Sequence, residues 1–408
     1  MLRKEIVTLR THVLQFANPK PKMSYNEDSF WGEGMAWAEP QYKVENLNKA
    51  GKMLVRSERE NWQNWAGDDW AEYEAAIAIV NNWRSSHAYP LNTFQMNLRG
   101  VGRKFEQDVL VAQRIKRLSS IRHKLDRLSN MKLSQMQDLG GCRAIFRDIE
   151  SVAKVCDYYT DESSVKHELV SLDDYVGSPK GSGYRGVHLV YRYVSDKGKT
   201  AYNGLKIEMQ LRSQFQHAWA TAVETVGMFS GQALKSSIGD EDWKRFFSLM
   251  GSAVAMRENC PLVPDTPIVG KDLREEIREH ASKLKVAERL DGYRNAMHNI
   301  STASQDAFYF LMQLDPKASQ LSVRGFKRNE AELAEAEYAK AEQLSKTNQG
   351  TDAVLVSVES VNALSKAYPN YFADTGLFSS LMKQAISGKR KPLELSGVKL
   401  EQGELPLD

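Results

Sequence analysis

The sequence has few cysteines and no long apolar run. Its 408 residues include only Cys142, Cys156 and Cys260, and none of these belongs to a CxxC pair. An odd, widely separated set argues against a disulfide framework and against a zinc knuckle. No apolar run approaches the roughly 18 residues that a membrane span needs, and the N-terminal residues lack the apolar core of a signal peptide. We therefore expect a cytoplasmic protein with no membrane partner.

A strong overall charge is also missing. The net charge of +3 is too small to make the whole molecule a binder of nucleic acid or membrane. Residues 103–147, however, hold eleven Lys and Arg against four Asp and Glu, so this segment carries +7 and the remainder −4. With 42% hydrophobic and 26% charged residues, the chain fits an ordinary globular protein of two or three domains.

The hydrophobic patterns predict an α+β protein. A helix is expected over 69–88, stopped by Pro90, and a second from Asn92 or Thr93 toward Arg127. Strands are expected in 141–149, 187–194 and 205–212, with helices near 150–162 and 213–229. A proline-containing linker over 255–270 precedes a helix over 272–298. Further along, the pattern predicts strands at 307–314, 320–326 and 353–358, a helix at 329–346, and two helices up to Ile386.

Arg114, Lys116 and Lys124 are three cations within about ten residues, in a stretch that also contains Arg122 and Arg127. Such a cluster concentrates positive potential where a polyphosphate could lie. A solvated basic helix face has the same composition. The stretch alone leaves both interpretations open.

Two glycine-containing segments follow this basic stretch. In Asp138-Leu-Gly-Gly-Cys-Arg143, the glycines let the backbone approach a ligand, although an Asp before Gly-Gly is often only a turn. The loop from Asp174 to His188 is rich in Gly and Ser but lacks the Walker order. Its Tyr184 offers a face for stacking a base. Its phosphate-binding candidates are Lys180, Arg185 and His188.

The strand expected at 205–212 alternates cleanly between apolar and polar residues. One face takes Leu205, Ile207, Met209 and Leu211, and the other takes Lys206, Glu208, Gln210 and Arg212. The polar face meets either solvent or a site. Asp138 and Glu208 are the carboxylates set among these basic segments at strand positions. Together they could hold one Mg²⁺, which prefers one or two carboxylates plus substrate phosphate oxygens.

Four strings, RIKRLSSIRHK, DLGGCR, DDYVGSPKGSGYRGVH and EMQLRSQFQH, resemble in order and spacing the synthetase domain of RelA/SpoT alarmone synthetases. The resemblance covers about 103–230. It implies a nucleotidyltransferase-like mixed β-sheet flanked by helices. It also implies transfer of pyrophosphate from ATP to a ribose 3′-hydroxyl.

The resemblance also implies roles for individual residues. Asp138 and Glu208 would hold Mg²⁺ as the catalytic carboxylates, and Glu208 would also take the proton of the attacking hydroxyl. Tyr184 would stack on the acceptor base. The ATP-binding set would be Arg114, Lys116, Lys124, Arg143 and Arg147, the last as an arginine that brackets adenine. The acceptor-binding set would be Lys180, Tyr184, His188, Gln210 and Arg212, and His217 also matches a family position.

No His-Asp pair occurs in the sequence, so we expect no hydrolase of the kind that long bifunctional members carry. The C-terminal part instead resembles the appended domain of fused toxin–antitoxin members of the CapRel type, through SVRGFKR, DAVLVSVES and Tyr368-Pro-Asn-Tyr371-Phe. That resemblance implies autoinhibition of the donor site by Tyr368 and Tyr371, and its relief by a phage structural protein. It further implies a toxic reaction at the tRNA 3′-CCA end. Aromatics after a proline also commonly just anchor a helix to a core.

We expect five parts: a helical region at 1–100, the synthetase domain at 101–230, a helical connector at 231–304, a small α+β regulatory domain at 305–388, and a tail at 389–408. Three functions remain open. The first is a toxin that pyrophosphorylates tRNA, the second an alarmone synthetase acting on GTP or GDP, and the third an inactive nucleotide-binding protein.

Overall fold

The computed structural model describes residues 37–60, 65–116, 118–160, 165–196, 198–229, 240–292, 307, 309–315, 320–330, 333–334, 337, 340–341, 352–357, 375–389, 394–395 and 398–399. The chain divides into two compact units, Met1–Ala38 and Glu39–Asp408. Almost all described residues belong to the second unit, and the fold below is that of this unit.

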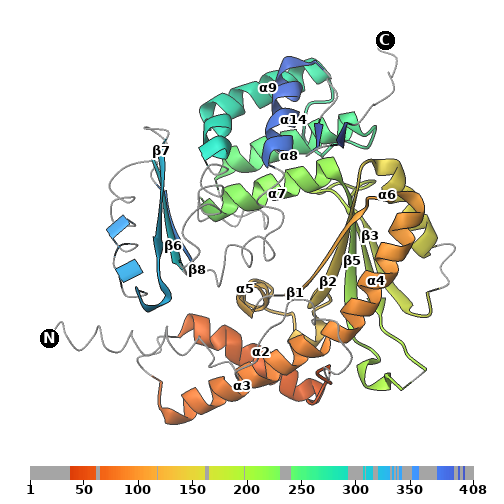
Figure 1. The fold of residues 1–408 in the computed structure, drawn as a ribbon, viewed down its shortest axis with the longest axis vertical. Helices are drawn as coiled ribbons and strands as arrows, with labels where there is room; N and C mark the ends of the chain where they lie inside the picture. The colour runs from red at the N-terminus through yellow and green to blue at the C-terminus, as the bar shows by residue number, and fades with distance from the viewer. Residues whose placement is uncertain are drawn as a thin grey trace. The chain divides into compact units, whose positions relative to one another are not determined.

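A mixed five-stranded sheet lies at the centre of the region that carries the candidate motifs (Figure 1). Its strands are β1 (Leu110–Ile115), β2 (Gly140–Phe146), β3 (Glu168–Asp174), β4 (Val187–Arg192) and β5 (Lys206–Ser213). Their order is β1-β2-β5-β4-β3. The pair β2–β5 is parallel and the other pairs are antiparallel. This sheet, flanked by helices, confirms the predicted α+β class.

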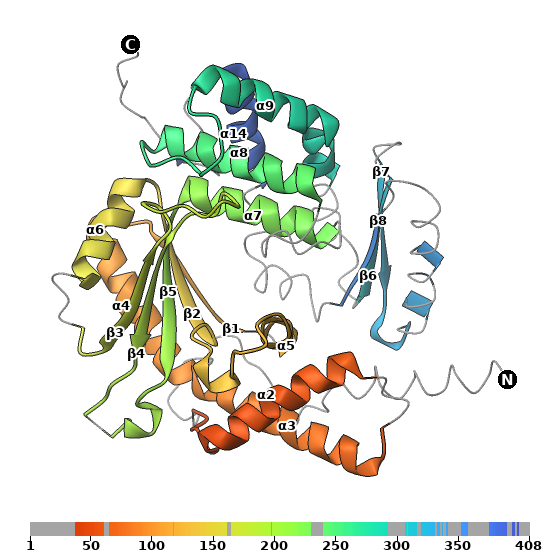
Figure 2. The ribbon, with the colours of Figure 1, turned by 180° about the vertical axis from the view of Figure 1, so that it is seen from behind.

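The two faces of the sheet have different chemistry, as the alternation in β5 predicts. Ile207, Met209 and Leu211 are each 0% exposed. They share their face with α4 (Ala88–Phe105) and α6 (Ile149–Thr160), which run beside each other along the sheet in Figures 1 and 2. The opposite face carries Glu208 and Gln210, which are only half-buried. The candidate polar site therefore lies on the face that α4 and α6 leave uncovered.

Two helices near the N-terminal end of the described chain pack against the basic segment. Helices α2 (Val44–Arg59) and α3 (Gly67–Ser86) share a core with α5 (Leu118–Arg127) and the 3-10 turn Leu133–Gln135. Apolar residues of this core include Leu47, Val80, Ile121 and Leu125. Arg59 also binds Asp126 of α5, at 2.6 Å. The basic helix α5 is thus held in place by α2 and α3.

Helix α7 (Gln214–Phe229) continues directly from β5 and shares one core with α8 (Glu241–Arg257), α9 (Gly270–Lys283) and α14 (Thr375–Ser387). Phe246 and Phe247 of α8 contact the ring of Phe378 on α14. The Arg257 guanidinium donates to Gln384 of α14 at 2.7 Å. Helix α14 is therefore a structural part of this helical core.

A separate antiparallel sheet has the order β7-β6-β8. Its strands are β6 (Tyr309–Asp315), β7 (Gln320–Phe326) and β8 (Asp352–Ser357). They agree closely with the three predicted strands. The remaining short elements are the 3-10 turns Thr200–Tyr202 and Arg328–Glu330, and the paired strands β9 (Glu394–Leu395) and β10 (Val398–Lys399). Within the described part of the chain, no helix is both long and apolar enough to cross a bilayer.

Three predicted elements were wrong in their bounds. The helix expected from Asn92 toward Arg127 is instead α4, strand β1 and α5. Pro90 does not end a helix but lies in the first turn of α4, where a missing N–H breaks no hydrogen bond. The helix expected over 272–298 is interrupted after α9, where Lys285 has a φ of 51°. Strand β3 was not predicted at all.

His87 sits between α3 and α4 and is 1% exposed. Burial lowers its pKa from 6.5 to about 4, and its neutral ring donates from Nδ1 to the Trp83 carbonyl at 2.6 Å. Below pH 6.5 His87 takes up a proton in the unfolded chain but stays neutral in the folded chain. The free energy of unfolding therefore decreases as the pH falls toward 4. We predict a loss of about 2–3 kcal/mol from this group between pH 7 and pH 4.5.

Urea unfolding at the two pH values measures that loss. The matched variant is His87→Gln, whose amide can still donate to the Trp83 carbonyl but does not titrate. The wild-type chain should lose about 2–3 kcal/mol more than His87→Gln between pH 7 and pH 4.5. Equal losses in the two proteins would show that His87 is not the group responsible.

Candidate active site

The register of the sheet brings the predicted polar residues into adjacent rows. Gly141 of β2 pairs with Arg114 of β1 and with Glu208 of β5. One row further along, Arg143 pairs with Gln210, which pairs in turn with His188 of β4. Directly paired residues project from the same face of a sheet. Residues that are far apart in the sequence therefore meet on one polar face.

Asp138 lies just before β2 and is held between two lysine ammonium groups. Its Oδ2 is 2.7 Å from Lys116 Nζ and its Oδ1 is 3.0 Å from Lys124 Nζ. The chain at Lys116 is fixed by hydrogen bonds to the Leu139 carbonyl and from the Arg84 guanidinium. The three charged side chains are 15–24% exposed, so they remain accessible to a ligand.

The pKa values of the two carboxylates are both low. Burial would raise the pKa of Asp138, but the charges of Lys116 and Lys124 outweigh it and hold the pKa below its ordinary value. Burial also opposes ionisation of Glu208, yet its hydrogen bonds with His188 and Gln210, together with Lys124, lower its pKa to about 2. Both groups are ionised at neutral pH, as ligands of a divalent cation must be.

A chain of hydrogen bonds links Tyr184 to Glu208 through His188. His188 Nδ1 lies 2.9 Å from Glu208 Oε1, and His188 Nε2 contacts the Tyr184 hydroxyl. Burial lowers the pKa of His188 despite the opposing effect of Glu208, and Arg212 and Lys180 lower it further. The neutral ring therefore donates a hydrogen bond from Nδ1 to Glu208, and its Nε2 accepts a hydrogen bond from the Tyr184 hydroxyl. The Tyr184 oxygen in turn accepts a hydrogen bond from Arg212, at 2.6 Å.

Residues 175–186 contribute aromatic rings and a cation to the same face; we call them the acceptor loop, after the role that the resemblance implies for Lys180 and Tyr184. Lys180 Nζ lies 3.8 Å from the centre of the Tyr175 ring, and Tyr175 contacts both Tyr184 and His188 edge-on. Arg185 does not serve as a free phosphate ligand here. It is 2% exposed and donates to the carbonyls of Pro261 and Val176.

The carboxylates fit a magnesium ion better than they fit a zinc ion. Among the residues that the structure describes, no group of three or more His, Cys, Asp and Glu side chains converges as metal ligands. A Mg²⁺ site needs only one or two carboxylates when phosphate oxygens complete the shell. Glu208 Oε2 would lie 3.8 Å from a Cβ built on Gly141, three residues beyond Asp138. The donor set therefore suits a hard cation that arrives with a polyphosphate.

The structure does not bring all the predicted residues together. Arg147 follows the opposite end of β2, and its guanidinium binds Asp108 at 3.0 Å. His217 is 4% exposed, and burial, aided by Arg143 and Arg212, lowers its pKa to about 3. The side chain of Arg114 lies outside the described residues, as do the proposed inhibitory residues Tyr368 and Tyr371.

The sequence reasoning missed two residues that shape the site. Tyr175 carries the Lys180 ammonium on its ring, and Trp219 of α7 contacts the Tyr184 ring at 6.3 Å between centroids. Tyr175 lies in the glycine-rich loop from Asp174 to His188, but no role was predicted for it. Trp219 lies in the helix predicted over 213–229, and the apolar pattern of such a helix does not separate a core aromatic from one beside a site.

Residues 113–228 match the family model described as a region found in RelA / SpoT proteins. The chain is 30% identical over 150 residues to a GTP pyrophosphokinase of Haemophilus influenzae. That match covers 36% of this chain and 18% of the length of the relative. The predicted resemblance to RelA/SpoT synthetases is thus confirmed for this region. These matches leave the resemblance of the C-terminal part to CapRel proteins untested, and it stays a prediction.

Solved structures give weaker matches to the fold. Small alarmone synthetase 1 of Bacillus subtilis, bound to its product pppGpp, is 20% identical with a TM-score of 0.38. The match covers 44% of this chain and 94% of that one. A GTP pyrophosphokinase family protein of Streptococcus pneumoniae is also 20% identical, with a TM-score of 0.36, covering 42% and 86% of the two chains.

The adjacent glycines of β2 have different neighbours, which leads to a paired prediction. A Cβ on Gly140 would lie 2.8 Å from Ile207 Cδ1 and 3.3 Å from His87 Cβ, whereas a Cβ on Gly141 would meet only Glu208 atoms at 3.6 and 3.8 Å. Gly140→Ala should therefore cost about 1–3 kcal/mol in urea unfolding. Gly141→Ala should stay within about 0.5 kcal/mol of the wild type. Equal effects in the two variants would contradict this assignment of faces.

Proposed function

We propose that residues 101–230 form an ATP-dependent pyrophosphokinase that transfers pyrophosphate from ATP to a ribose 3′-hydroxyl. The observation that carries this proposal is the pair of ionised carboxylates: Asp138 lies between Lys116 and Lys124, and the charge of Lys124 also lowers the pKa of Glu208. Phosphoryl chemistry depends on alignment and charge neutralisation more than on covalent help from the protein. The match to the RelA/SpoT region supports the same reaction class.

In the proposed reaction, the ribose oxygen attacks the β-phosphorus of ATP, AMP leaves and the hydroxyl proton is released. Lys116 and Lys124 already lie against a carboxylate and would bind the triphosphate, together with Arg114 and Arg143. A Mg²⁺ ion held by Asp138 and Glu208 would neutralise phosphate charge and align the reacting groups. The low pKa of Glu208 suits this role better than that of a general base, which works best when its pKa lies near the operating pH.

On the acceptor side, Tyr184 would stack on a base while Lys180 and His188 contact phosphate. Gln210 and Arg212 support this arrangement, since Arg212 donates to both the Tyr184 hydroxyl and the Gln210 side chain. The Tyr184 hydroxyl is thus held by two hydrogen bonds, one from Arg212 and one to His188. A ring held in this way is ready to stack without further ordering, which favours binding.

We assign the tRNA 3′-CCA end as the acceptor, which would make the protein a toxin that halts translation in the cytoplasm. Arg127 of α5 and Lys132 are exposed cations of the basic segment, and they would contact RNA phosphates beyond the nucleotide pocket. GTP or GDP is the second candidate, favoured by the relative named as a GTP pyrophosphokinase. An inactive nucleotide-binding protein is the third.

One labelling experiment separates these three functions. The full chain is incubated with ATP labelled in its β- or γ-phosphate and Mg²⁺, and is offered tRNA, GTP and GDP together. We expect label on tRNA that is lost when the 3′-terminal adenosine is removed beforehand. Label on the guanine nucleotide alone would replace tRNA by the second candidate. Label on no acceptor, with the wild-type chain and equally with a Tyr368→Ala variant that would open the donor site, would leave the inactive protein.

The same assay tests Glu208. Glu208→Gln removes the charge but keeps the shape, so transfer should fall by at least about 100-fold while the unfolding curve stays close to that of the wild type. Glu150→Gln, at an exposed position on α6, is the matched control and should keep full activity. Equal turnover by Glu208→Gln and wild type would remove Glu208 from the mechanism.

We further propose that the C-terminal part restrains the enzyme in cis through Tyr368 and Tyr371, and that a phage structural protein relieves the restraint. Two flat aromatic faces are chemically suited to fill an adenine slot beside arginines. Truncation before Phe308 would also remove α14, whose Phe378, Leu381 and Met382 belong to the α7–α8–α9 core. Point variants are therefore the cleaner test.

Expression of Tyr368→Ala or Tyr371→Ala should inhibit growth more strongly than the wild-type chain, because the donor site would be open. Tyr368→Phe and Tyr371→Phe keep the aromatic faces and should behave like the wild type. Growth curves after induction measure the effect, with protein levels compared by immunoblot. Unchanged or weaker inhibition by both alanine variants would contradict autoinhibition by these tyrosines.

A further inference from the structure

Helix α8 lies beyond the segment that matches the RelA/SpoT region, yet it touches the acceptor loop through its backbone. Gly183 of the loop has a φ of 90°, and a Cβ built on it would lie 2.5 Å from the Phe247 carbonyl oxygen of α8. A Cβ built on Gly251 would lie 2.6 Å from Gly183 Cα and 2.7 Å from Gly183 O. Neither Gly183 nor Gly251 could carry a Cβ atom unless the neighbouring backbone moved. The loop and the helix therefore meet without an intervening side chain.

Trp219 connects this contact to the site. Its indole Nε1 donates to the Phe247 carbonyl at 2.8 Å, and its ring contacts the Tyr184 ring edge-on. Trp219 is 5% exposed and Phe247 2% exposed, so neither can move without repacking the core. The backbone of α8 therefore limits where Tyr184 can lie.

The segment after α8 also holds the loop, through Arg185, two residues after Gly183. The buried Arg185 guanidinium donates to the Pro261 carbonyl at 2.8 Å and to Val176 within the loop at 2.9 Å. The Pro261 segment is itself fixed, because Val263 N donates to Ser252 Oγ of α8 at 2.9 Å. Arg185 thus joins the two ends of the acceptor loop to each other and to the segment that follows α8.

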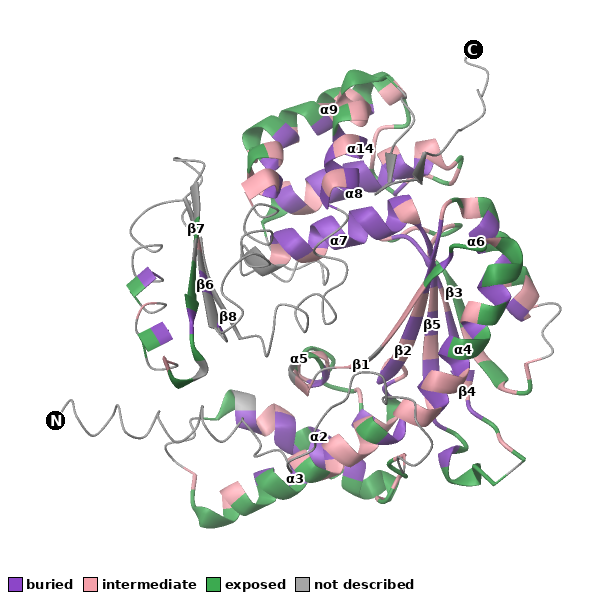
Figure 3. Ribbon diagram, in the orientation of Figure 1, coloured by how far each residue is buried: buried purple, intermediate pink, exposed green. Residues whose placement is uncertain are grey.

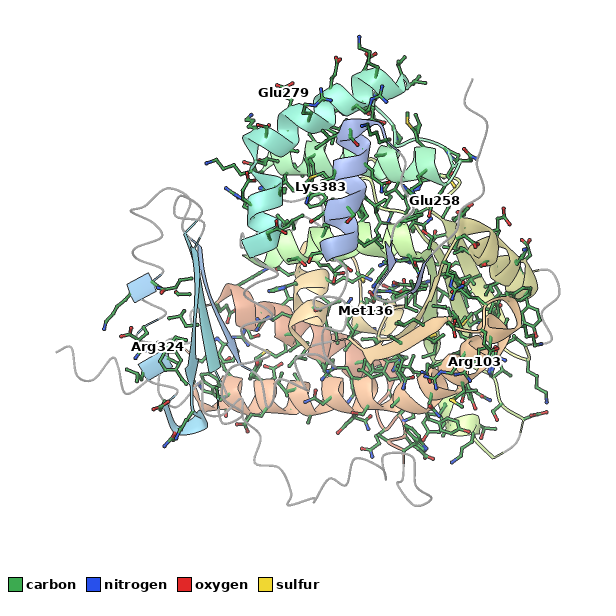
Figure 4. The ribbon with its side chains drawn as sticks, turned by 45° about the horizontal axis from the view of Figure 1, so that its top comes forward. Arg103, Met136, Glu258, Glu279, Arg324 and Lys383 are labelled. Atoms are coloured by element: carbon green, nitrogen blue, oxygen red, sulfur yellow. The ribbon has the colours of Figure 1, made fainter. Side chains whose placement is uncertain are left out.

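Glu258 joins the same element to the strand that carries the site. It lies at the C-terminal end of α8 (labelled in Figure 4) and accepts hydrogen bonds from Ser213 Oγ and from Gln216 Nε2 at 2.9 Å. Ser213 ends β5, one residue after Arg212, which binds the Tyr184 hydroxyl. The partners of Tyr184 on the strand and on the loop are therefore positioned from the same helix.

We infer that α8 with residues 258–263 sets the conformation of the acceptor loop, and that Gly251 is a positioning residue for acceptor binding. Gly251 contacts Gly183, the residue before Tyr184, and contacts neither carboxylate of the site. A side chain at Gly251 displaces the loop backbone while the donor side, built on Lys116, Lys124 and Asp138, keeps its contacts. This inference rests on the proposed function, because it concerns the acceptor of that reaction.

The test is Gly251→Ala in the full chain. Its methyl group must push Gly183 by several tenths of an ångström, and a misplacement of about 1 Å can cost as much as about 100-fold in such sites. We expect KM for the acceptor, or Kd where binding is measured directly, to rise at least about 10-fold. The affinity for ATP should stay within about twofold. Initial rates give KM, with GDP and a short RNA ending in CCA as the two acceptor probes, and fluorescence titration of the same probes gives Kd.

Gly100→Ala is the matched control, because Gly100 is also helical and a Cβ there meets nothing within 4 Å. Arg185→Lys cannot make both hydrogen bonds, to Pro261 and to Val176, so it should raise the same constant, and it decides the question if Gly251→Ala does not fold. An unchanged acceptor constant, or an equal loss of ATP and acceptor affinity, overturns the inference. No transfer by the wild-type chain and none by a Tyr368→Ala variant, in which the proposed restraint is removed, would overturn the proposed function instead, and the Kd measurements would still test the role of Gly251.

Discussion

The parallel pairing of β2 with β5 is the constraint on which the candidate site depends. It sets Gly141 beside Glu208 and Arg143 beside Gln210, so one register fixes the relation between the two sequence motifs. A shift by one residue would turn Glu208 toward α4 and bring Met209 onto the polar face, since side chains alternate along a strand. The burial of Ile207, Met209 and Leu211 opposes such a shift. The apolar face thus determines where the polar face presents its charges.

Burial and positive charge together set the protonation states of the other groups of the site. Burial lowers the pKa of His188 and of His217; Arg212 and Lys180 lower that of His188 further, and Arg143 and Arg212 lower that of His217 further. Positive charge also favours anions. Lys116 and Lys124 keep Asp138 ionised, and Glu208 is kept ionised by its hydrogen bonds with His188 and Gln210 together with Lys124. This combination suits a polyphosphate that brings a divalent cation and does not suit a neutral substrate.

The sequence predicted the central strands of the sheet and missed both edges. Strands β2, β4 and β5 are largely buried, so their apolar residues form a visible pattern, as the colouring of Figure 3 shows. Strand β3 is exposed along most of its length, and β1 begins with the exposed Leu110 and contains the polar Gln113 and Arg114. Neither carries an alternation that distinguishes a strand, because edge positions are only half covered. Their pairing is decided by neighbours that are distant in the sequence.

The same limit applies to the site. The motif residues that flank the central strands, such as Asp138 and Tyr184, were predicted because their spacing is local. Arg147, which was predicted to bracket the adenine, lies at the opposite end of β2 from Asp138. The seven residues of the strand separate the two side chains. The role of α8 in positioning the loop could not be predicted from the sequence. Gly251 and Phe247 act through backbone atoms, which leave no recognisable pattern of side chains.

The proposed donor and acceptor sides rest on different parts of the fold, and this separation affects how the proposed activity would be controlled. Lys124 is carried by α5, whose Ile121 and Leu125 pack with α2 and α3, while Arg84 of α3 fixes the chain at Lys116. The acceptor loop instead rests on α8, which shares its core with α14 near the C-terminal end. Because α14 and the acceptor loop both contact α8, and Lys116 and Lys124 contact neither in the bonds described above, a change in the α14 core would act on the loop before it acted on the lysines around Asp138.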